Sequence, residues 1–235
     1  MDEANLIEKL TRYCLTRQEA TIYLCLYQNE SATGYEIAKQ TGMSRSNVYN
    51  ALKGLEEKGA ACLDEGNSKK YMAVDISEFC NNFIRRAEQT RNELINEMPV
   101  RKPEVKGYLT ITGHENIMNR IYNMLGQCRH RIYFCASSQI IRHFIAPIQE
   151  LIKEQKKVVI LTREKPDLED VIFYRSDYSE NEIHLIIDSK SAISGECGVG
   201  SENICLYSEH NNFVRILKQA LSNTIKLAEL EQNKE

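Results

Sequence analysis

A run of polar side chains at residues 45–53 carries the groups that proteins use to recognise DNA bases. Arginine can donate two parallel hydrogen bonds to guanine, and asparagine can pair in the same way with adenine. Val48, Leu52 and Leu55 are spaced four and then three residues apart, so we expect a helix that buries them and turns the polar residues outward. The candidate DNA-binding residues on this helix are Arg45, Ser46, Asn47, Tyr49, Asn50 and Lys53. Two alternatives stay open: a phosphate contact or inward packing for Tyr49, and a merely solvated polar face for the others.

The segments before this helix have the spacing of a helix-turn-helix motif. Capping-box patterns, in which Thr is followed three residues later by Glu, predict helices near residues 17–29 and 34–40. Gly42 suits the left-handed turn that ends the second helix, Ser44 caps the third, and Gly59 ends it. A short helix, a glycine turn and a longer capped helix form the arrangement of that DNA-binding motif.

Two short strands predicted at residues 60–63 and 70–74 complete a winged helix-turn-helix domain. The polar segment 64–69 between them is expected to form the turn of the wing. Lys69 and Lys70 are further candidate DNA-binding residues, since lysines bind backbone phosphates without regard to base sequence. A solvated turn without such a role is the alternative.

The overall charge limits how this domain could bind DNA. A net charge of -3 and a pI near 6.0 exclude a uniformly basic nucleic-acid coat protein. Residues 1–72 contain nine Lys or Arg and ten Asp or Glu, so DNA binding must depend on how the charges are arranged. Dimerisation would help by doubling the contacts.

A long helix is predicted from residue 76, with Asp75 and Glu78 as its capping box. Its apolar positions follow heptad spacing and give the candidate dimerisation residues Ile76, Cys80, Phe83, Ala87 and Leu94. The alternative is a helix packed only on its own chain. We therefore predict a DNA-binding domain at residues 1–75, a dimerisation and linker helix at 76–103, and a regulatory domain at 104–235.

The third region alternates strand-like and helical segments, which predicts an α/β domain with a mostly parallel sheet covered on both faces. Strands are expected at residues 107–111, 131–135, 157–161 and 183–187, and helices at 112–128, 138–154 and 211–230. The predicted fold class is an α+β winged helix-turn-helix plus a C-terminal α/β domain joined by a long helix.

Ser137 and Ser138 follow one of these strands, and open parallel sheets bind ligands outside the carboxyl ends of their strands. With Asp188, they are speculative ligand residues for a small-molecule effector. Helix capping by the two serines and a simple turn around Asp188 are the alternatives.

The N-terminal motifs resemble those of the TrmB-like transcriptional regulators. The resemblance lies in Leu15-Thr-Arg-Gln-Glu19-Ala20, Glu36-Ile37-Ala38, Ser44-Arg-Ser-Asn-Val-Tyr49, Leu55-Glu-Glu-Lys-Gly59 and Lys70-Tyr71 of the wing, and it covers about the first 95 residues. It implies binding of operator DNA as a homodimer. It also implies a C-terminal domain that senses a small molecule, often a sugar.

The C-terminal half resembles, more weakly, one half of a phospholipase D-like fold, whose enzymes carry a His-x-Lys-x4-Asp motif. When the motif is aligned on Asp188, Asn181 takes the His position and Ile183 takes the Lys position. The resemblance therefore implies a scaffold without the nucleophile and the phosphate clamp, and we expect no enzyme activity. The alternatives are a phosphodiesterase or nuclease that depends on His184, and a winged helix that binds protein.

Other features narrow the class of protein. No apolar run is long enough to span a membrane, the first residues carry no secretion signal, and the five histidines show no metal-ligand spacing. The eight cysteines lack paired spacing and are expected to be free thiols in a reducing cytosol, with a redox sensor at Cys197 as the alternative. We expect a cytoplasmic protein with no metal, no cofactor and no membrane partner.

Overall fold

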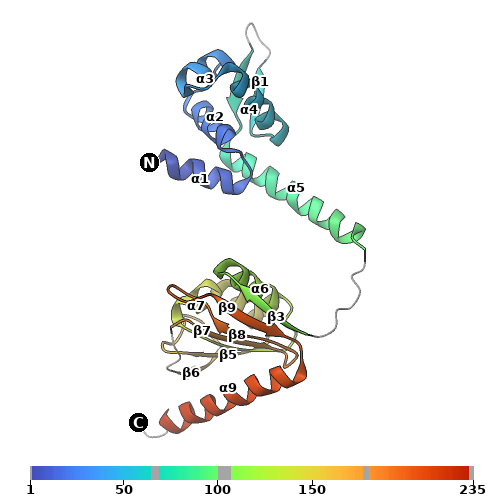
Figure 1. Cartoon of the computed structure of the whole chain (residues 1–235), viewed down its shortest axis with the longest axis vertical. Helices are drawn as coiled ribbons and strands as arrows, with labels where there is room; N and C mark the ends of the chain where they lie inside the picture. The colour runs from blue at the N-terminus through green and yellow to red at the C-terminus, as the bar shows by residue number, and fades with distance from the viewer. Residues whose placement is uncertain (1, 65–68, 100–106, 177–179, 233–235) are drawn as a thin grey trace. The chain divides into compact units, whose positions relative to one another are not determined.

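The computed structural model describes residues 2–64, 69–99, 107–176 and 180–232. The chain divides into two compact units, residues 1–101 and 102–235, and each is described by itself. Figure 1 shows helices around a small hairpin in the first unit, and one sheet with helices in the second. No helix within the described ranges is long and apolar enough to cross a membrane.

The N-terminal unit is a winged helix-turn-helix domain that continues into a long helix (Figure 1). Its elements are α1 (Glu3–Tyr13), α2 (Arg17–Gln28), α3 (Gly34–Thr41), α4 (Arg45–Lys58), β1 (Ala61–Asp64), β2 (Lys70–Ala73) and α5 (Ile76–Glu97). The helices and strands expected from residue 17 onward are confirmed. The sequence-based expectations do not include α1, although Leu6, Ile7 and Leu10 follow a helical spacing behind the Asp2 cap.

Local signals fix where the helices of the motif begin and end. Both expected capping boxes are formed, at the starts of α2 and α3. The side chain of Ser44 accepts a hydrogen bond from the backbone N–H of Asn47 and so caps α4. Gly42 and Gly59 end α3 and α4 with φ angles of 70° and 71°, a left-handed conformation that strains other residues.

The core of the N-terminal unit lies where α2, α4 and the start of α5 meet. Tyr23, Leu52 and Phe79 come from these three helices, and all are buried. The hydroxyl of Tyr23 donates a hydrogen bond to the carbonyl of Val74 at 2.8 Å, so this buried polar group has a partner. Burial of these side chains from three helices holds α4 firmly against the rest of the domain.

The wing is an antiparallel pair of strands attached to the helices. At its outer end Asp64 lies opposite Lys70. An isolated bridge between Ala32 and Tyr71 joins β2 to the segment before α3. The turn expected at residues 64–69 falls mostly outside the described residues.

The C-terminal unit is a seven-stranded sheet with the strand order β3-β9-β8-β7-β4-β5-β6 (Figure 1). Its strands are β3 (Tyr108–Thr112), β4 (Arg131–Ala136), β5 (Lys157–Thr162), β6 (Ile172–Arg175), β7 (Glu182–Ile187), β8 (Ser191–Glu196) and β9 (Ile204–Ser208). Its helices are α6 (His114–Gly126), α7 (Ser138–His143), α8 (Ile145–Lys153) and α9 (Asn211–Gln232). A winged helix-turn-helix followed by a strand-and-helix domain agrees with the predicted fold class.

The sheet is mixed, and the expectation of a mostly parallel sheet is wrong. Only the pairs β4–β5 and β5–β6 are parallel. The pairs β3–β9, β4–β7, β7–β8 and β8–β9 are antiparallel. A tight turn at Asp188 and Ser189, with φ angles of 53° and 55°, joins β7 directly to β8 and imposes the antiparallel direction. The strands β6, β8 and β9 were not among the expected elements.

Helices cover both faces of the sheet, as expected. Helices α6, α7 and α8 pack on one face around Phe134 and Ile121, both fully buried. Helix α9 covers the other face, where Val214 and Leu221 belong to the same buried cluster as Val159. Figure 1 shows α9 running along the sheet on the side away from α6.

The single helix expected at residues 138–154 is divided into α7 and α8, with the break at Phe144. Proline is the reason, because Pro147 has no N–H to donate to the carbonyl of His143 four residues earlier. The hydroxyl of Tyr122 donates to that carbonyl instead, at 2.6 Å. Phe144 itself is fully buried and stabilises the break from within the core.

Candidate nucleic-acid interface

Helix α4 has one apolar face and one polar face. Val48, Leu52 and Leu55 are all fully buried against the core, as their spacing predicted. The polar residues predicted to contact DNA all lie exposed on the other side of the helix: Arg45, Ser46, Asn47, Asn50 and Lys53. The structure therefore brings these donors and acceptors together on one open surface. Their contact with DNA stays a prediction.

Tyr49 lies on the same open side, with 51% of its surface exposed, so the inward-packing alternative is wrong. Its ring rests against Gly34, the first residue of α3. A Cβ atom at Gly34 would lie 2.7 Å from Cζ of this ring, closer than side chains can approach. Gly34 thus lets the ring of Tyr49 close over the start of α3.

Tyr35 is a surface residue that sequence reasoning missed. The guanidinium of Arg45 lies over its ring, with Cζ 4.7 Å from the ring centroid. A cation–π contact at an exposed site contributes about 0.5–1 kcal/mol and restricts a flexible arginine to fewer orientations. The ring of Tyr35 therefore prepositions the donor group that is best suited to guanine. The two residues are ten positions apart, and no local spacing rule connects them.

The predicted lysine contacts are exposed. Lys53 on α4 forms an ion pair with Glu57 at 3.8 Å, and both side chains are more than half exposed. Such surface pairs contribute little, so Lys53 can exchange Glu57 for a phosphate at small cost. In the wing, Lys69 and Lys70 are exposed at the end of the β1–β2 pair. Their positions are compatible with phosphate contacts, which stay predicted.

A partly buried ion pair fixes α4 against α2. Nζ of Lys58, near the end of α4, lies 2.5 Å from Oε2 of Glu19, whose side chain is only 8% exposed. The same carboxylate accepts the backbone N–H of Thr16 in the capping box. Burial opposes ionisation of Glu19, but the hydrogen bonds from Lys58 and Thr16 outweigh it and lower the pKa of Glu19.

Gly54 makes room for this carboxylate in the middle of α4. A Cβ atom at position 54 would lie 2.2 Å from Oε1 of Glu19. Glycine in the interior of a helix costs stability, so its presence there is the one sequence signal of a close approach. The signal does not say which residue approaches.

The first part of α5 is attached to its own domain. The ring of Phe83 packs on the ring of Tyr13, with centroids 4.7 Å apart, and the Tyr13 hydroxyl donates to the carbonyl of Cys80 at 2.8 Å. One guanidinium nitrogen of Arg86 donates to the carbonyl of Lys58, the last residue of α4, at 2.6 Å. Helix α5 is therefore hydrogen-bonded directly to the end of α4.

The predicted dimerisation residues divide into two groups. Cys80 and Phe83 are partly covered within the domain, so for them the alternative of packing on the same chain holds. Ile76, Ala87 and Leu94 are exposed, with exposed fractions of 37% for Ile76 and 54% for Leu94. Sequence reasoning missed three further exposed apolar residues, which are Ile84 and Ile95 of α5 and Met98, which caps its end.

The predicted ligand residues Ser137 and Ser138 lie at the carboxyl end of β4. Ser137 caps α7 by accepting the N–H of Ile140, so the helix-capping alternative is confirmed for it. The hydroxyl of Ser138 is hydrogen-bonded to that of Thr162, at the end of β5, over 3.2 Å. Both serines also line a cavity of about 290 Å³, which is compatible with the predicted ligand role.

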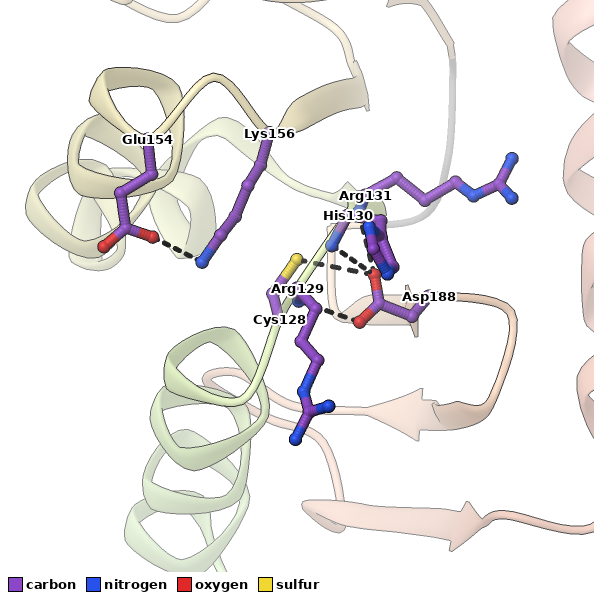
Figure 2. Close-up of polar contacts among 7 residues, drawn as sticks. All are labelled: Cys128, Arg129, His130, Arg131, Glu154, Lys156 and Asp188. Atoms are coloured by element: carbon purple, nitrogen blue, oxygen red, sulfur yellow. Dashed lines mark hydrogen bonds and ion pairs between the residues drawn. The ribbon is translucent and has the colours of Figure 1, made fainter.

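Asp188 does not join these serines, which corrects the predicted ligand set. It lies at the opposite end of β4, where its carboxylate accepts the backbone N–H groups of Arg129, His130 and Arg131, each at 2.8 Å (Figure 2). Figure 2 shows the side chains of both arginines pointing away from this carboxylate. Burial opposes ionisation, but the three donors outweigh it and lower the pKa of Asp188. Asp188 therefore anchors the β7–β8 turn and is a structural residue.

The described residues contain no group of three or more His, Cys, Asp or Glu side chains that could hold a metal ion. All eight cysteines are free thiols, four of them buried and one, Cys62, exposed. Cys197 is fully buried and burial raises its pKa, so the redox-sensor alternative has no support from its surroundings.

Comparison with known proteins places the N-terminal domain in a family. Residues 10–77 match the model of the family described as sugar-specific transcriptional regulator TrmB. This match runs from the end of α1 to the start of α5, and so contains α4 and both strands of the wing.

Similar proteins extend the comparison over more of the chain. The uncharacterised protein YrhO of Bacillus subtilis is 20% identical over 237 residues, which cover 96% of this chain and 86% of that protein. The sugar-sensing HTH-type transcriptional regulator TrmBL1 of Pyrococcus furiosus is 26% identical over 139 residues, which cover 56% of this chain and 40% of the regulator. A solved structure of the archaeal chromatin protein TrmBL2 has 18% identity and a TM-score of 0.46, covering 97% of this chain and all of that one. The chain thus carries at residues 10–77 a TrmB-like domain, of the kind found in a family of DNA-binding transcriptional regulators.

Proposed function

We propose that this protein regulates transcription by binding a specific operator in double-stranded DNA through α4. The observation that carries the proposal is the exposed polar face of α4, with Arg45 stacked on Tyr35 at its leading end. In helix-turn-helix proteins the second helix of the motif enters the major groove with its N-terminal residues nearest the bases. Arg45, Asn47 and Asn50 then lie where they can pair with base edges. Lys53 and the wing lysines would bind phosphates and supply affinity that does not depend on sequence.

We also propose that the protein binds DNA as a homodimer assembled through the outer part of α5. Ala87 and Leu94 of the predicted set remain candidates, and Ile84 takes the place of Phe83, which is already packed on Tyr13. Exposed Ile84, Ala87, Leu94 and Met98 recur at steps of three, seven and four residues, which keeps a single seam facing a partner helix. Two such domains could place their α4 helices in successive major grooves, about 34 Å apart, on a palindromic site.

We propose finally that a small molecule that binds the C-terminal domain controls the affinity of the protein for its operator. The names of the matched family and of TrmBL1 refer to sugars, and the cavity beside Ser137 and Ser138 is one place where an effector fits. An effector can change operator affinity only if it binds the DNA-competent and DNA-incompetent forms unequally. The proposal therefore requires that bound DNA changes the affinity of the protein for the effector, and that the bound effector changes its affinity for DNA by the same factor.

We propose further that the C-terminal domain is not an enzyme and that the protein acts in the cytoplasm. Asn181 stands where phospholipase D-like enzymes carry the nucleophilic histidine, and Ile183, at the lysine position, is fully buried. His184, the remaining candidate, contacts the side chains of Ser194 at 2.8 Å and Glu182 at 2.9 Å. These contacts support a structural role for His184.

An electrophoretic mobility shift assay tests the DNA-binding proposal. The full chain is mixed with genomic fragments that include its own promoter, and the shifted fragment is then mapped by footprinting. We expect a discrete, two-fold symmetric footprint that Arg45→Ala weakens and Arg12→Ala leaves unchanged, since Arg12 is exposed on α1 and pairs with Glu8. The proposal fails if no fragment shifts, or if every fragment binds as well as random DNA. If the chain retains another protein but shifts no DNA fragment, the alternative of a winged helix that binds protein would be favoured.

A further inference from the structure

Strand β3 forms one edge of the C-terminal sheet, and β9 is its only neighbouring strand in the described part of the chain (Figure 1). Proteins usually protect an edge strand with charges, proline or shortness, because its unpaired backbone groups can bind another strand. The opposite edge strand, β6, is the shorter of the two and ends in the exposed Arg175. The five residues Tyr108–Thr112 of β3 include no charge and no proline, and Leu109 is 45% exposed. The edge at β3 is therefore open to pairing.

The hydrogen bonds at the end of β3 show which way its backbone groups point. Hydrogen-bonded and non-hydrogen-bonded pairs of residues alternate along two antiparallel strands. The backbone N–H of Gly113 donates to the carbonyl of Asn203 at 2.8 Å, so the next pair, in which Thr112 lies opposite β9, is a non-hydrogen-bonded pair. The carbonyl of Thr112 instead accepts the side-chain amide of Asn116 at 2.9 Å. Thr112 therefore directs its backbone groups away from β9.

The rest of the strand follows from this end by the same alternation. Leu109 and Ile111 form hydrogen-bonded pairs with β9. The backbone groups that point to the open edge belong to Tyr108, Thr110 and Thr112. Apart from the carbonyl of Thr112, these groups have no hydrogen bond to the described residues, and that carbonyl keeps a lone pair for a second donor. Every second residue of β3 thus offers a donor and an acceptor to another strand.

A second copy of β3 fits this edge in one symmetric, antiparallel register. With Thr110 opposite the partner's Thr110, each donates a hydrogen bond to the other, and Tyr108 exchanges two bonds with the partner's Thr112. Leu109 then lies opposite the partner's Ile111 in a non-hydrogen-bonded pair, where side chains come closest. Both side chains are on the face of the sheet where Ile111 packs against the core. The register that satisfies the backbone therefore also joins apolar to apolar side chains.

We propose that β3 pairs with β3 of a second copy of this chain and joins the two sheets into one. A second copy is the fitting occupant because the strand complements itself, and because an uncharged strand brings no like charges together across the two-fold axis. Two five-residue strands cover far less than the about 1,200–2,000 Å² that stable interfaces bury. The pairing is therefore weak and forms at protein concentrations above those at which α5 would dimerise. It rests neither on DNA binding nor on α5.

Sedimentation equilibrium of the full chain at rising concentration tests the proposal. The two-fold axis sets position 110 opposite itself, so Thr110→Lys or Thr110→Glu brings two like charges together. Each variant should show this association at least tenfold more weakly than the parent. An equimolar mixture of the two variants sets opposite charges at the axis and should recover the association. The control variants Asn123→Lys and Asn123→Glu add the same charges at an exposed position of α6 and should associate like the parent.

Amide hydrogen exchange of the parent, followed by NMR, tests the pairing without any substitution. The amides of Leu109 and Ile111 should be protected at every concentration, because they bond to β9. The amides of Tyr108, Thr110 and Thr112 should gain protection only as the concentration rises. The proposal is overturned if these outward amides exchange equally fast at all concentrations, if Thr110→Lys associates as strongly as the parent, or if the mixture of charged variants associates no better than either alone. Neither measurement contains DNA, so both outcomes are independent of the proposed function.

Discussion

The ion pair between Glu19 and Lys58 gives a sharp test of how α4 is held in place. In the variant Glu19→Ala both the pair and the capping box are lost, whereas Glu19→Gln removes the charge and keeps an acceptor for the Thr16 N–H. Loss of a cap costs about 1 kcal/mol. Breaking a fully buried ion pair costs about 3–5 kcal/mol, but the side chain of Lys58 is 33% exposed and can be hydrated, so we expect about 1–2 kcal/mol here. The expected losses are therefore about 2–3 kcal/mol for Glu19→Ala and about 1–2 kcal/mol for Glu19→Gln.

Because the chain has two units, the measurement must report on each unit separately. Hydrogen exchange followed by mass spectrometry along a urea series does this, with peptides from α4 as the reporter and peptides from α6 as the internal control. The control variant Glu57→Gln removes only the exposed pair with Lys53 and should change stability by less than about 0.5 kcal/mol.

The pH dependence has a definite sign. The pKa of Glu19 is lowered in the folded chain, so its stabilisation is fully present above the ordinary pKa of the unfolded chain. That stabilisation is lost as the pH falls through the lowered value, and the difference between the parent and Glu19→Gln should shrink accordingly. The reasoning is refuted if Glu19→Gln is as damaging as Glu19→Ala, or if the α6 peptides lose protection equally.

Four further predictions address the DNA surface, the dimer and the C-terminal turn. Arg45→Ala should cost about 1–3 kcal/mol on the operator and relax the preference at one base pair in competition assays; equal loss on random DNA would make Arg45 a phosphate contact. Lys69→Ala combined with Lys70→Ala should weaken all sequences alike and flatten the salt dependence, and an unchanged slope would remove the wing from the interface. Leu94→Asp should dissociate the dimer in sedimentation without lowering the thermal stability of the N-terminal unit, since Leu94 is 54% exposed; a dimer that persists would place assembly elsewhere. Asp188→Asn should destabilise the C-terminal unit by about 1–3 kcal/mol at neutral pH. That deficit should fade as the pH falls through the lowered pKa of Asp188, and a constant deficit would contradict the assigned hydrogen bonds.

The N-terminal fold could be predicted because its signals are local. The capping boxes, the glycines at 42 and 59, and the spacing of Val48, Leu52 and Leu55 each act within one or two helical turns. The same spacing correctly assigned the exposed face of α4. In the C-terminal sheet, a turn around Asp188 was one of the sequence-based alternatives, but the left-handed backbone that makes β7 and β8 antiparallel, and the pairing of strands distant in sequence, were not predicted.

The contacts that position the candidate site are not local, and this is why they escaped prediction. Tyr35 supports Arg45 through space, and Lys58 reaches Glu19 across 39 positions of sequence. The predicted dimerisation residue Phe83 packs on Tyr13 of its own chain for the same reason, since Tyr13 lies 70 positions earlier in the sequence. In each case a contact between residues distant in the sequence decided how the side chain is placed, and local spacing rules do not predict such contacts.

The hydrogen bond from Arg86 to the carbonyl of Lys58 has a mechanical consequence. Helix α5 cannot roll about its axis while that bond stays intact unless α4 tilts with it. If α4 binds DNA as proposed, a rotation of the outer part of α5 would be passed through this hydrogen bond to the DNA-binding helix. A variant without the Arg86 side chain would lose this hydrogen bond, and the two helices could then rotate independently of each other.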